Sequence, residues 1–353
     1  MPHELSYGSE PADSPPLPPP EGPLTEAVTR AIVRPASDHR DRASLERVTE
    51  NAAEGVEAPL DNLDLQLALN LCYELHYLSF RGVDPAWEWD PELLALRSRM
   101  ESIFLGGLDR KTAELPDPGP GDLPGTLVGM KAPDAIGELA GFVERESDLP
   151  QMRELLIHRS AERLRRCDAW LWTLPRLQGR TRTALALIEG DENARLGQLG
   201  RSLRSVGLDD RVGAYRDLLP PGTLCLINLY SLFCLKRQGR GAASGHVAMA
   251  KILSGREDRA CGRAMRRLGF GDETTGYCED SAVSSEAMVE VAVVDLAGRL
   301  ATEEPMLAGS ILFGARAALV AQGRFSEWML DRWKSGSSSL LTESVGFDRS
   351  SDS

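Results

Sequence analysis

The chain has 353 residues, 42% of them hydrophobic, which is enough for one large core or two modest ones. Its formal net charge of −13 argues against nucleic-acid binding, because that function needs clustered lysine and arginine side chains. The sequence has no run of about eighteen apolar residues and no apolar signal region at its N-terminus, so we expect a cytoplasmic protein with no membrane partner.

The two ends of the chain are expected to lie outside the folded core. Residues 1–24 include PADSPPLPPPEGP, which is too rich in proline to fold, so we predict a disordered arm that is either a docking ligand or a flexible tail. Residues 25–59 are predicted to be loosely ordered and partly helical, and the serine-rich residues 336–353 to form a disordered tail. Residues 60–335 then form the folded domain.

Within residues 60–335 the apolar pattern is helical almost throughout. A leucine stripe marks the first helix, at Leu63, Leu67, Leu71, Leu75 and Leu78. A second helix begins at Pro91, and the segment LPDPGPGDLPGT at 115–126 is expected to be a surface loop. Later helices are predicted near 150–168, 180–206, 209–218, 222–237, 241–254, 257–268, 279–302, 304–322 and 324–334. No stretch alternates as a strand does, so the predicted fold class is all-α.

Several segments of this helical region occur in an order that is typical of one protein family. They are LCYELHYLSFRGVDPAWEWDPELL at 71–94, HRSAERL at 158–164, TLPRLQGR at 173–180, LIEGDE at 187–192, NLYSLF at 228–233, SGHVAMAK at 244–251, RRLGFG at 266–271 and DLAGRLATEEPMLAGSILFGA at 295–315. As a set they resemble the haem-oxygenase-like di-iron oxidase and oxygenase family, often labelled iron-containing redox enzymes. The resemblance covers most of residues 65–335 and implies a haem-oxygenase-like helical bundle with an additional N-terminal helical layer.

The resemblance breaks down at the iron ligands. The family holds two irons with carboxylates and imidazoles from three core helices. Its Glu and His on the first core helix correspond to positions near Arg166 and Trp170, neither of which can be that ligand. Its Glu-x9-His on the second helix keeps Glu192 but has Ser202 in place of the histidine.

The third core helix lacks the His-x3-Asp-x2-His of the family. Ser281, Ser285 and Met288 stand at these positions, on one helical face that is nearly uncharged. The resemblance therefore implies that the chain has no family-type metal site, and we expect no cofactor. Iron would be expected only if this alignment were wrong.

Without metal ligands, the centre of the bundle is predicted to hold a cavity. Its expected lining comprises Asp168, Trp170, Asp191, Ser202, Ser281, Ser285 and Met288. A buried arginine needs a carboxylate, so we expect Arg166 to pair with Glu192, either to fill the vacated site or to act as a catalytic and substrate-binding pair. Glu192 would be a general base if burial raises its pKa, whereas an adjacent Arg166 would lower that pKa.

Other reactive side chains are expected to be structural. Cys167 follows Arg166 but has no histidine beside it, which favours a packing role over a thiolate nucleophile. His76, His158 and His246 are predicted to be histidines with satisfied hydrogen bonds in the core.

Two classes of function follow from these residues. The first is a metal-independent enzyme of specialised metabolism, such as antibiotic biosynthesis, that acts on a small polar, amino-acid-derived substrate. The second is a non-catalytic pseudoenzyme subunit that stabilises or regulates a biosynthetic partner protein, with a homodimer or a heterodimer left open. A further alternative is an iron-dependent oxidase or oxygenase with an unconventional ligand set.

Overall fold

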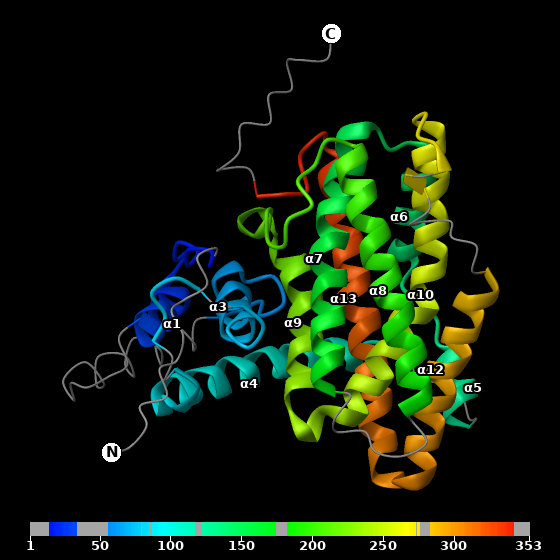
Figure 1. Cartoon of the computed structure of the whole chain (residues 1–353). Coiled ribbons are helices and arrows are strands. Elements are labelled where there is room, and N and C mark those ends of the chain that lie inside the picture. Colours follow the sequence, from blue (N-terminus) through cyan, green and yellow to red (C-terminus); the bar gives the residue numbers. More distant parts are fainter. Residues whose placement is uncertain are drawn as a thin grey trace, which may run out of the picture. The chain divides into compact units, whose positions relative to one another are not determined.

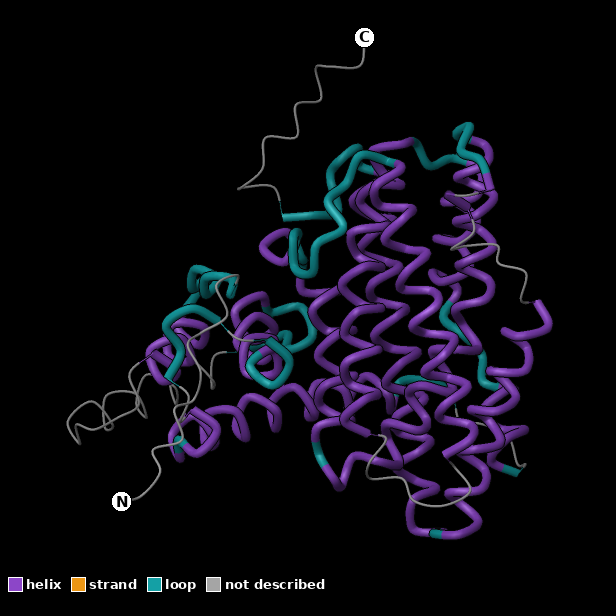
Figure 2. Tube along the Cα trace, in the orientation of Figure 1, coloured by secondary structure: helices purple, strands orange, loops and turns teal. Residues whose placement is uncertain are grey.

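The computed structural model describes residues 14–33, 56–78, 80–84, 87–116, 122–173, 182–272, 274–275 and 283–341, shown in Figure 1 and Figure 2. Within these ranges the chain forms α-helices and short 3-10 helices, and it forms no strand. The predicted all-α class is confirmed. The chain divides into two compact units, residues 1–107 and 108–353, so the boundary falls inside the stretch 60–335 that was predicted as one domain.

The N-terminal unit has a small apolar core of its own, which is why it separates from the rest. Its elements are α1 (Pro23–Val33), α3 (Leu63–Glu74), the 3-10 helix η1 (Trp87–Trp89) and the first part of α4 (Pro91–Ala113). α1 packs on α3 and buries Leu24 and Val28. The buried face of α3 carries Leu65 and Leu69, whereas Leu63 and Leu67 of the predicted stripe are only half-buried.

Asp64 joins the two helices of this unit. Its carboxylate accepts hydrogen bonds from the backbone N–H groups of Leu24 and Thr25, each at 2.8 Å, and so caps the start of α1. The predicted arm therefore ends before residue 24, because that residue lies inside α1. The carbonyl oxygen of Pro15 also accepts a hydrogen bond from Arg81. Residues 1–13 of the arm lie outside the described residues.

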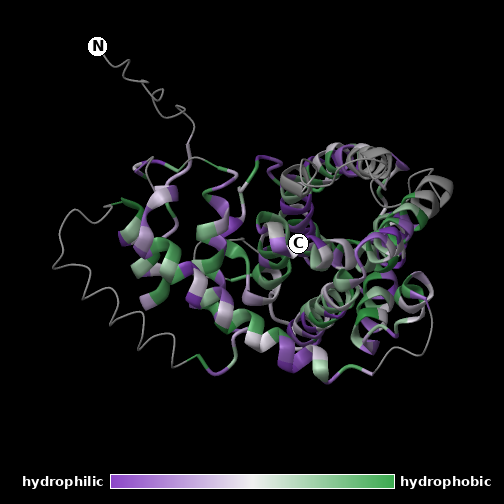
Figure 3. Cartoon of the chain, turned by 90° about the horizontal axis from the view of Figure 1, so that it is seen from below, coloured by the Kyte–Doolittle hydropathy of each residue, from purple (hydrophilic) through white to green (hydrophobic). Residues whose placement is uncertain are grey.

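The C-terminal unit is a bundle of long helices, which run side by side in Figure 1 and are seen nearly end-on in Figure 3. Its α-helices are α5 (Leu123–Gly129), α6 (Asp134–Arg145), α7 (Leu149–Thr173), α8 (Arg182–Ser205), α9 (Pro221–Leu235), α10 (Arg240–Arg267), α12 (Val283–Glu303) and α13 (Ala308–Lys334). α10 is the central helix, because it packs against α13, α12, α6 and α9. α7 packs against α8 and α9.

Glycines allow α10 and α13 to approach backbone to backbone. A Cβ atom placed on Gly245 of α10 would collide with the carbonyl oxygen of Ile311, and one on Gly314 of α13 would collide with the carbonyl oxygen of Ala242. Larger residues at these positions would push the helices apart. The close approach fixes the position of α10, which carries side chains of the site described below.

Several predicted helix boundaries differ from those in the structure. α10 and α13 are each continuous where two helices were predicted, because one glycine in a helix costs only about 1 kcal/mol and packing outweighs it. Residues 209–218 contain only the 3-10 helix η4 (Arg216–Leu218), since Gly213 adopts a φ of 75°. The predicted loop at 115–126 ends earlier, as Asp122 caps α5 by accepting from Gly125 at 2.8 Å.

The chain after α13 is tied to α7, although residues 336–353 were predicted to be disordered. Glu154 of α7 accepts hydrogen bonds from the hydroxyl of Ser338 and from the backbone N–H of Ser339, at 2.7 and 2.9 Å. His158 lies between Ser339 Oγ and Thr223 Oγ1, at 3.0 and 2.8 Å, and is a satisfied core histidine as predicted. Residues 342–353 lie outside the described part of the chain.

The apolar character of α13 comes from its place in the bundle. By length and composition alone the stretch Pro305–Lys334 would also suit a membrane span, and half of its apolar window is buried inside the structure. The buried side chains of α13 lie among α10, α9 and α6, which are its neighbours. Helix packing therefore accounts for these apolar residues.

Substitution of Gly245 by alanine is expected to destabilise the protein. Alanine is the better helix former by about 1 kcal/mol, but its methyl group would meet the backbone of Ile311, so we expect a net loss of about 2 kcal/mol or more in the free energy of unfolding. Gly197→Ala in α8 is the matched control, because nothing lies within 4 Å of the added methyl group. Urea unfolding should show the control to be equally or more stable than the wild type. Equal stability of both variants would contradict the close packing.

Candidate functional site

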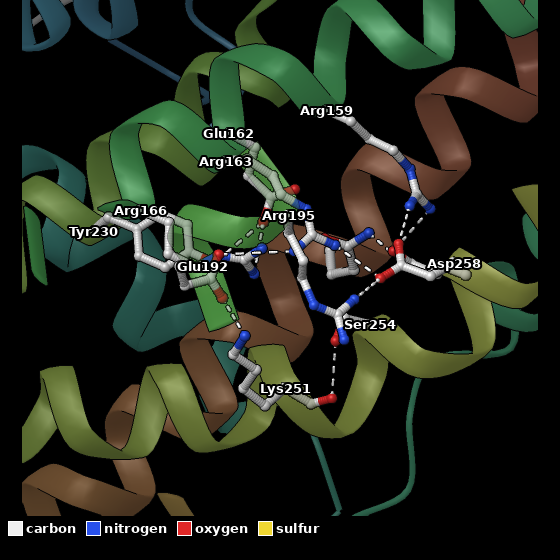
Figure 4. A network of polar contacts seen from close by, with 12 residues as sticks. Arg159, Glu162, Arg163, Arg166, Glu192, Arg195, Tyr230, Lys251, Ser254 and Asp258 are labelled. Carbon is white, nitrogen blue, oxygen red and sulfur yellow. Dashed lines mark hydrogen bonds and ion pairs between the residues drawn. The ribbon is translucent and has the colours of Figure 1, made fainter. Parts of the chain in front are cut away.

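A cluster of charged side chains lies at the interface of α7, α8 and α10 (Figure 4). Its members are Arg159, Glu162, Arg163 and Arg166 from α7, Glu192 and Arg195 from α8, and Lys251 and Asp258 from α10. On each helix these residues are spaced so that they share one face. We call this set the charged cluster.

Glu192 is the first anion at the centre of the cluster. Arg166 Nε lies 3.1 Å from Glu192 Oε2 and Arg163 Nη1 lies 3.7 Å from the same oxygen, while Lys251 donates to Oε1. The side chains of Glu192 and Arg166 are each 2% exposed, so these charges are shielded from water. Burial alone would raise the pKa of Glu192, but Arg166, Lys251 and Arg163 hold it well below its usual range.

Asp258 is the second anion, and three arginines surround it. It accepts hydrogen bonds from Arg159, from Arg163 Nη2 at 2.8 Å and from Arg195 Nη1 at 2.9 Å. Burial would raise the pKa of Asp258, whereas these arginines lower it to about 2. Arg163 contacts both Glu192 and Asp258, so it joins the two halves of the cluster.

A polar cavity of ≈ 30 Å³ lies beside the cluster, which is room for about two water molecules. Arg166, Tyr230 and His246 line it. The hydroxyl of Tyr230 donates to Glu162 at 3.1 Å, and the ring of His246 meets the ring of Tyr230 edge to face at 4.5 Å. Burial and Arg166 lower the pKa of His246 to about 3, so its ring is neutral.

His246 differs from the prediction of a satisfied histidine. Its Nε2 atom is buried and has no hydrogen-bond partner among the described residues. A buried polar atom without a partner costs free energy, so a group that bonded to Nε2 would be stabilised. Nε2 of His246, a residue of the cavity lining, is therefore a buried hydrogen-bonding atom without a partner in the described part of the chain.

Glu257 of α10 lines this cavity and also a smaller one of ≈ 20 Å³ beside it. Burial raises the pKa of Glu257 to about 7, against the opposing effect of Arg159, whose Nη2 lies 3.6 Å away. Gln322 of α13 donates to Glu257 Oε1 at 2.8 Å. Glu257 is thus a carboxylic acid that exchanges its proton near neutral pH, which is the property of a general acid or base.

The structure brings together only part of the predicted site. The predicted ion pair of Arg166 and Glu192 is confirmed. Asp168 instead faces Arg165, at 3.4 Å, and Ser202 donates to the carbonyl oxygen of Thr274 at 2.6 Å. Neither of them lines the cavity beside the charged cluster.

The remaining predicted lining residues cannot be placed. Ser281 and the side chains of four others lie outside the described residues: Trp170, Asp191, Ser285 and Met288. Cys167 is a buried thiol whose pKa burial raises to about 12, in agreement with its predicted packing role. Its thiolate is therefore disfavoured.

Sequence reasoning missed most of the charged cluster. Arg159, Glu162 and Arg163 recur with Arg166 at helical spacing, a signal that was present in the sequence. Lys251 and Asp258 share a face of α10. The sequence did not show that this face lies against Glu192, because spacing does not reveal which helices face each other. Among the described residues, no group of three or more His, Cys, Asp and Glu side chains could hold a metal ion.

Breaking the ion pairs of Glu192 is expected to destabilise the bundle in a coupled manner. Glu192→Gln leaves three buried cations without their shared anion, so we expect a loss on the order of 3 kcal/mol or more. Arg166→Met should cost less, because Arg163 and Lys251 still balance Glu192. The double variant should lose less than the sum of the two.

Urea unfolding of the two single variants and of the double variant measures this coupling. Glu144→Gln is the control, because the Glu144–Arg263 pair is partly exposed to solvent and should contribute less than about 1 kcal/mol. Small and additive losses in the three cluster variants would contradict the network.

The raised pKa of Glu257 predicts a pH-dependent stability. A folded-state pKa of about 7, above the ordinary 4.5, means that the wild type loses stability as the pH rises through this window and Glu257 ionises in the folded state. Glu257→Gln removes this loss. The variant should exceed the wild type by about 1–3 kcal/mol near pH 8 and match it near pH 4.5. Urea midpoints at both pH values measure the difference, and an equal effect at both would contradict the assigned pKa.

Comparison with known proteins supports the family resemblance of the bundle. No curated protein matches the chain in sequence. Residues 153–323 match the family model described as iron-containing redox enzyme. The match runs from α7 into α13, contains every member of the charged cluster, and lies within residues 65–335, over which the resemblance was found. This match supports the predicted resemblance to the haem-oxygenase-like family of iron-containing redox enzymes over residues 153–323.

Proposed function

We propose that this protein is a metal-independent member of its family, in which side-chain cations take the place that iron holds in the family's enzymes. The observation that supports this proposal is the pairing of Glu192 with Arg166, Arg163 and Lys251. The family resemblance implies that Glu192 stands at the position of an iron ligand. All four side chains are buried, so the charges compensate one another without solvent.

Iron does not fit the described residues around Glu192. A ferrous or ferric ion needs several carboxylate and imidazole donors that face one point. Here the Glu192 carboxylate already accepts from Lys251 and Arg166, and a further two or three positive charges would repel the cations that surround it. We therefore derive no chemical step through iron.

The chemistry that remains is proton transfer. Glu192 is a poor general base, because its cationic partners favour the ionised form so strongly that it hardly accepts a proton. Glu257 suits this role better, since its pKa of about 7 lets it both donate and accept at neutral pH. In this proposal Glu192 and Arg166 are positioning residues of the cluster, and Glu257 is the acid–base group.

The substrate class follows from the polar lining of the cavity. We propose a small polar substrate, such as an amino-acid derivative, and a place in specialised metabolism, with antibiotic biosynthesis as one setting. The same proposal includes a cytoplasmic protein without nucleic-acid or membrane partners. These points rest on the composition of the chain and on the polar residues of the site.

A second candidate function is that of a pseudoenzyme subunit that stabilises or regulates a biosynthetic partner, as a homodimer or a heterodimer. The observation that favours it is the size of the cavity, because ≈ 30 Å³ holds about two water molecules and no complete metabolite. A protein of this kind would act through its surface rather than through the charged cluster.

Iron content distinguishes the metal-independent proposal from an iron-dependent oxidase or oxygenase with unconventional ligands. Full-length protein incubated with ferrous iron under anaerobic conditions and desalted should retain well below one iron per chain by elemental analysis. Glu192→Ala should retain the same small amount, since the wild-type carboxylate is not a ligand. Two irons per chain in the wild type, lost in Glu192→Ala, would overturn the proposal.

A further inference from the structure

We propose that the groove between α6 and α10 binds an acidic, amphipathic helix of a partner protein. The groove has a volume of ≈ 770 Å³, and no member of the charged cluster lines it. This surface goes beyond the proposed function, because it can bind a partner whether the charged cluster is catalytic or structural.

The groove runs lengthwise along both helices, which point in the same direction. The guanidinium of Arg256 on α10 lies 3.2 Å from the position that a Cβ atom on Gly137 of α6 would take. Arg263 Nε lies 2.7 Å from Glu144 Oε1. The second contact is about two turns further along α6 and along α10 alike, so the helices are parallel. Because α6 is about 18 Å long, about three turns of a third helix can lie beside it.

The groove carries more positive than negative charge. The three carboxylates of its lining are each balanced by a cation. These pairs are Asp134 with Lys131 at 3.7 Å, Glu138 with Lys334 at 3.8 Å, and Glu144 with Arg263 at 2.7 Å. Two further arginines of the lining, Arg145 and Arg256, form no ion pair with a described residue. An anion that enters the groove therefore meets two uncompensated guanidinium groups.

Two glycines of α6 fix the spacing of these guanidinium groups. Arg145 folds back along its own helix, so that Nη2 lies 2.9 Å from the Cβ position of Gly141, and Arg256 reaches across from α10 to Gly137. The two glycines are one turn apart, where Cβ positions are about 6 Å from each other. The guanidinium nitrogens thus lie within about 12 Å of each other and repel. Carboxylates one turn apart on a bound helix match this spacing and accept from both groups.

The same groove offers an apolar surface. Ile136 and Ala140 of α6 and Leu253 and Ala260 of α10 belong to its lining. An amphipathic helix with apolar residues beside its carboxylates would cover this surface as it neutralises the arginines. A compact anion would neutralise the arginines and leave the apolar part in water.

The exposure of the arginines favours a helix over a small molecule. Arg145, Arg256 and Arg263 are all exposed to solvent. Sites for small ligands bury roughly 70–90% of the ligand surface, whereas a helix in a groove buries one side only. The net charge of −13 does not prevent the approach of an acidic helix, because at physiological salt charges are screened beyond about 8 Å.

Synthetic helical peptides of alanine and leucine are the probes, titrated into the full-length protein at about 0.1 M salt and followed by fluorescence anisotropy. The first has two glutamates one turn apart, at i and i+4, and the second has glutamines at these positions. The acidic peptide should bind about tenfold more tightly, because it alone forms two charge pairs with the arginines. A third peptide, whose glutamates lie on opposite faces, should bind about as weakly as the glutamine peptide. Equal affinities for the three peptides would overturn the proposal.

A double variant tests the residues. Arg145→Gln with Arg256→Gln should weaken binding of the acidic peptide about tenfold and leave binding of the glutamine peptide unchanged. The matched control is Arg259→Gln with Arg299→Gln, which removes the same charge from two exposed arginines outside the groove lining. The control should change the affinity less than about twofold. Equal weakening in both double variants would show general electrostatic attraction and overturn the assignment of the groove. Circular dichroism checks that both are folded.

Two further measurements address other occupants. Inorganic phosphate that binds as tightly as the acidic peptide would show a site for small anions and overturn the proposal. Sedimentation of the wild type as a dimer that Arg145→Gln with Arg256→Gln dissociates would make a second copy of the chain the occupant, and the proposal would again be wrong. Absence of saturable binding up to about 1 mM acidic peptide would have the same consequence. The iron measurement is independent of all these outcomes.

Discussion

The pairing of buried charges between α7, α8 and α10 is the interaction on which the centre of this bundle depends. Two carboxylates, Glu192 and Asp258, are each surrounded by three cationic side chains, and Arg163 contacts both. An isolated charge in this interior would be strongly unfavourable, so every member of the cluster requires the others. The helices that carry these residues can therefore adopt few other arrangements.

This constraint depends in turn on the backbone of α10. Gly245 and the neighbouring Gly241 lie where a Cβ would strike α13, so α10 sits unusually close to that helix. The same helix carries His246, Lys251, Glu257 and Asp258, within about four turns. The position of the charged cluster thus depends on two contacts of α10. Its backbone packs against α13, and its charged side chains pair with those of α7 and α8.

The all-α fold could be predicted from the sequence, because helical periodicity and the family segments agree over most of the chain. Helix ends could not, as the interior glycine Gly323 shows: it packs on Pro133, a residue nearly two hundred positions away, so α13 continues through it. Local propensity favoured a break there, and tertiary packing overrode it.

The candidate site was only partly predictable for a similar reason. Pairing of Arg166 with Glu192 followed from the chemistry of a buried arginine, once the family alignment had placed both on core helices. The partners Lys251 and Asp258 were not predictable, because periodicity assigns a residue to a helical face but does not say which other helix that face contacts. Ser202 was predicted to line the cavity, and this prediction was wrong. Its hydroxyl donates a hydrogen bond to the carbonyl oxygen of Thr274.

Glu192 and Glu257 show why burial alone does not determine the chemistry of a carboxylate. Burial raises the pKa of both, yet the pKa of Glu192 ends well below its usual range and that of Glu257 at about 7. The difference lies in their neighbours, because Glu192 contacts three cations whereas Glu257 has Arg159 at 3.6 Å and the repelling charges of Glu162 and Asp258. Glu192 therefore stays ionised and holds the helices together through its ion pairs, whereas Glu257 can exchange a proton beside the cavity.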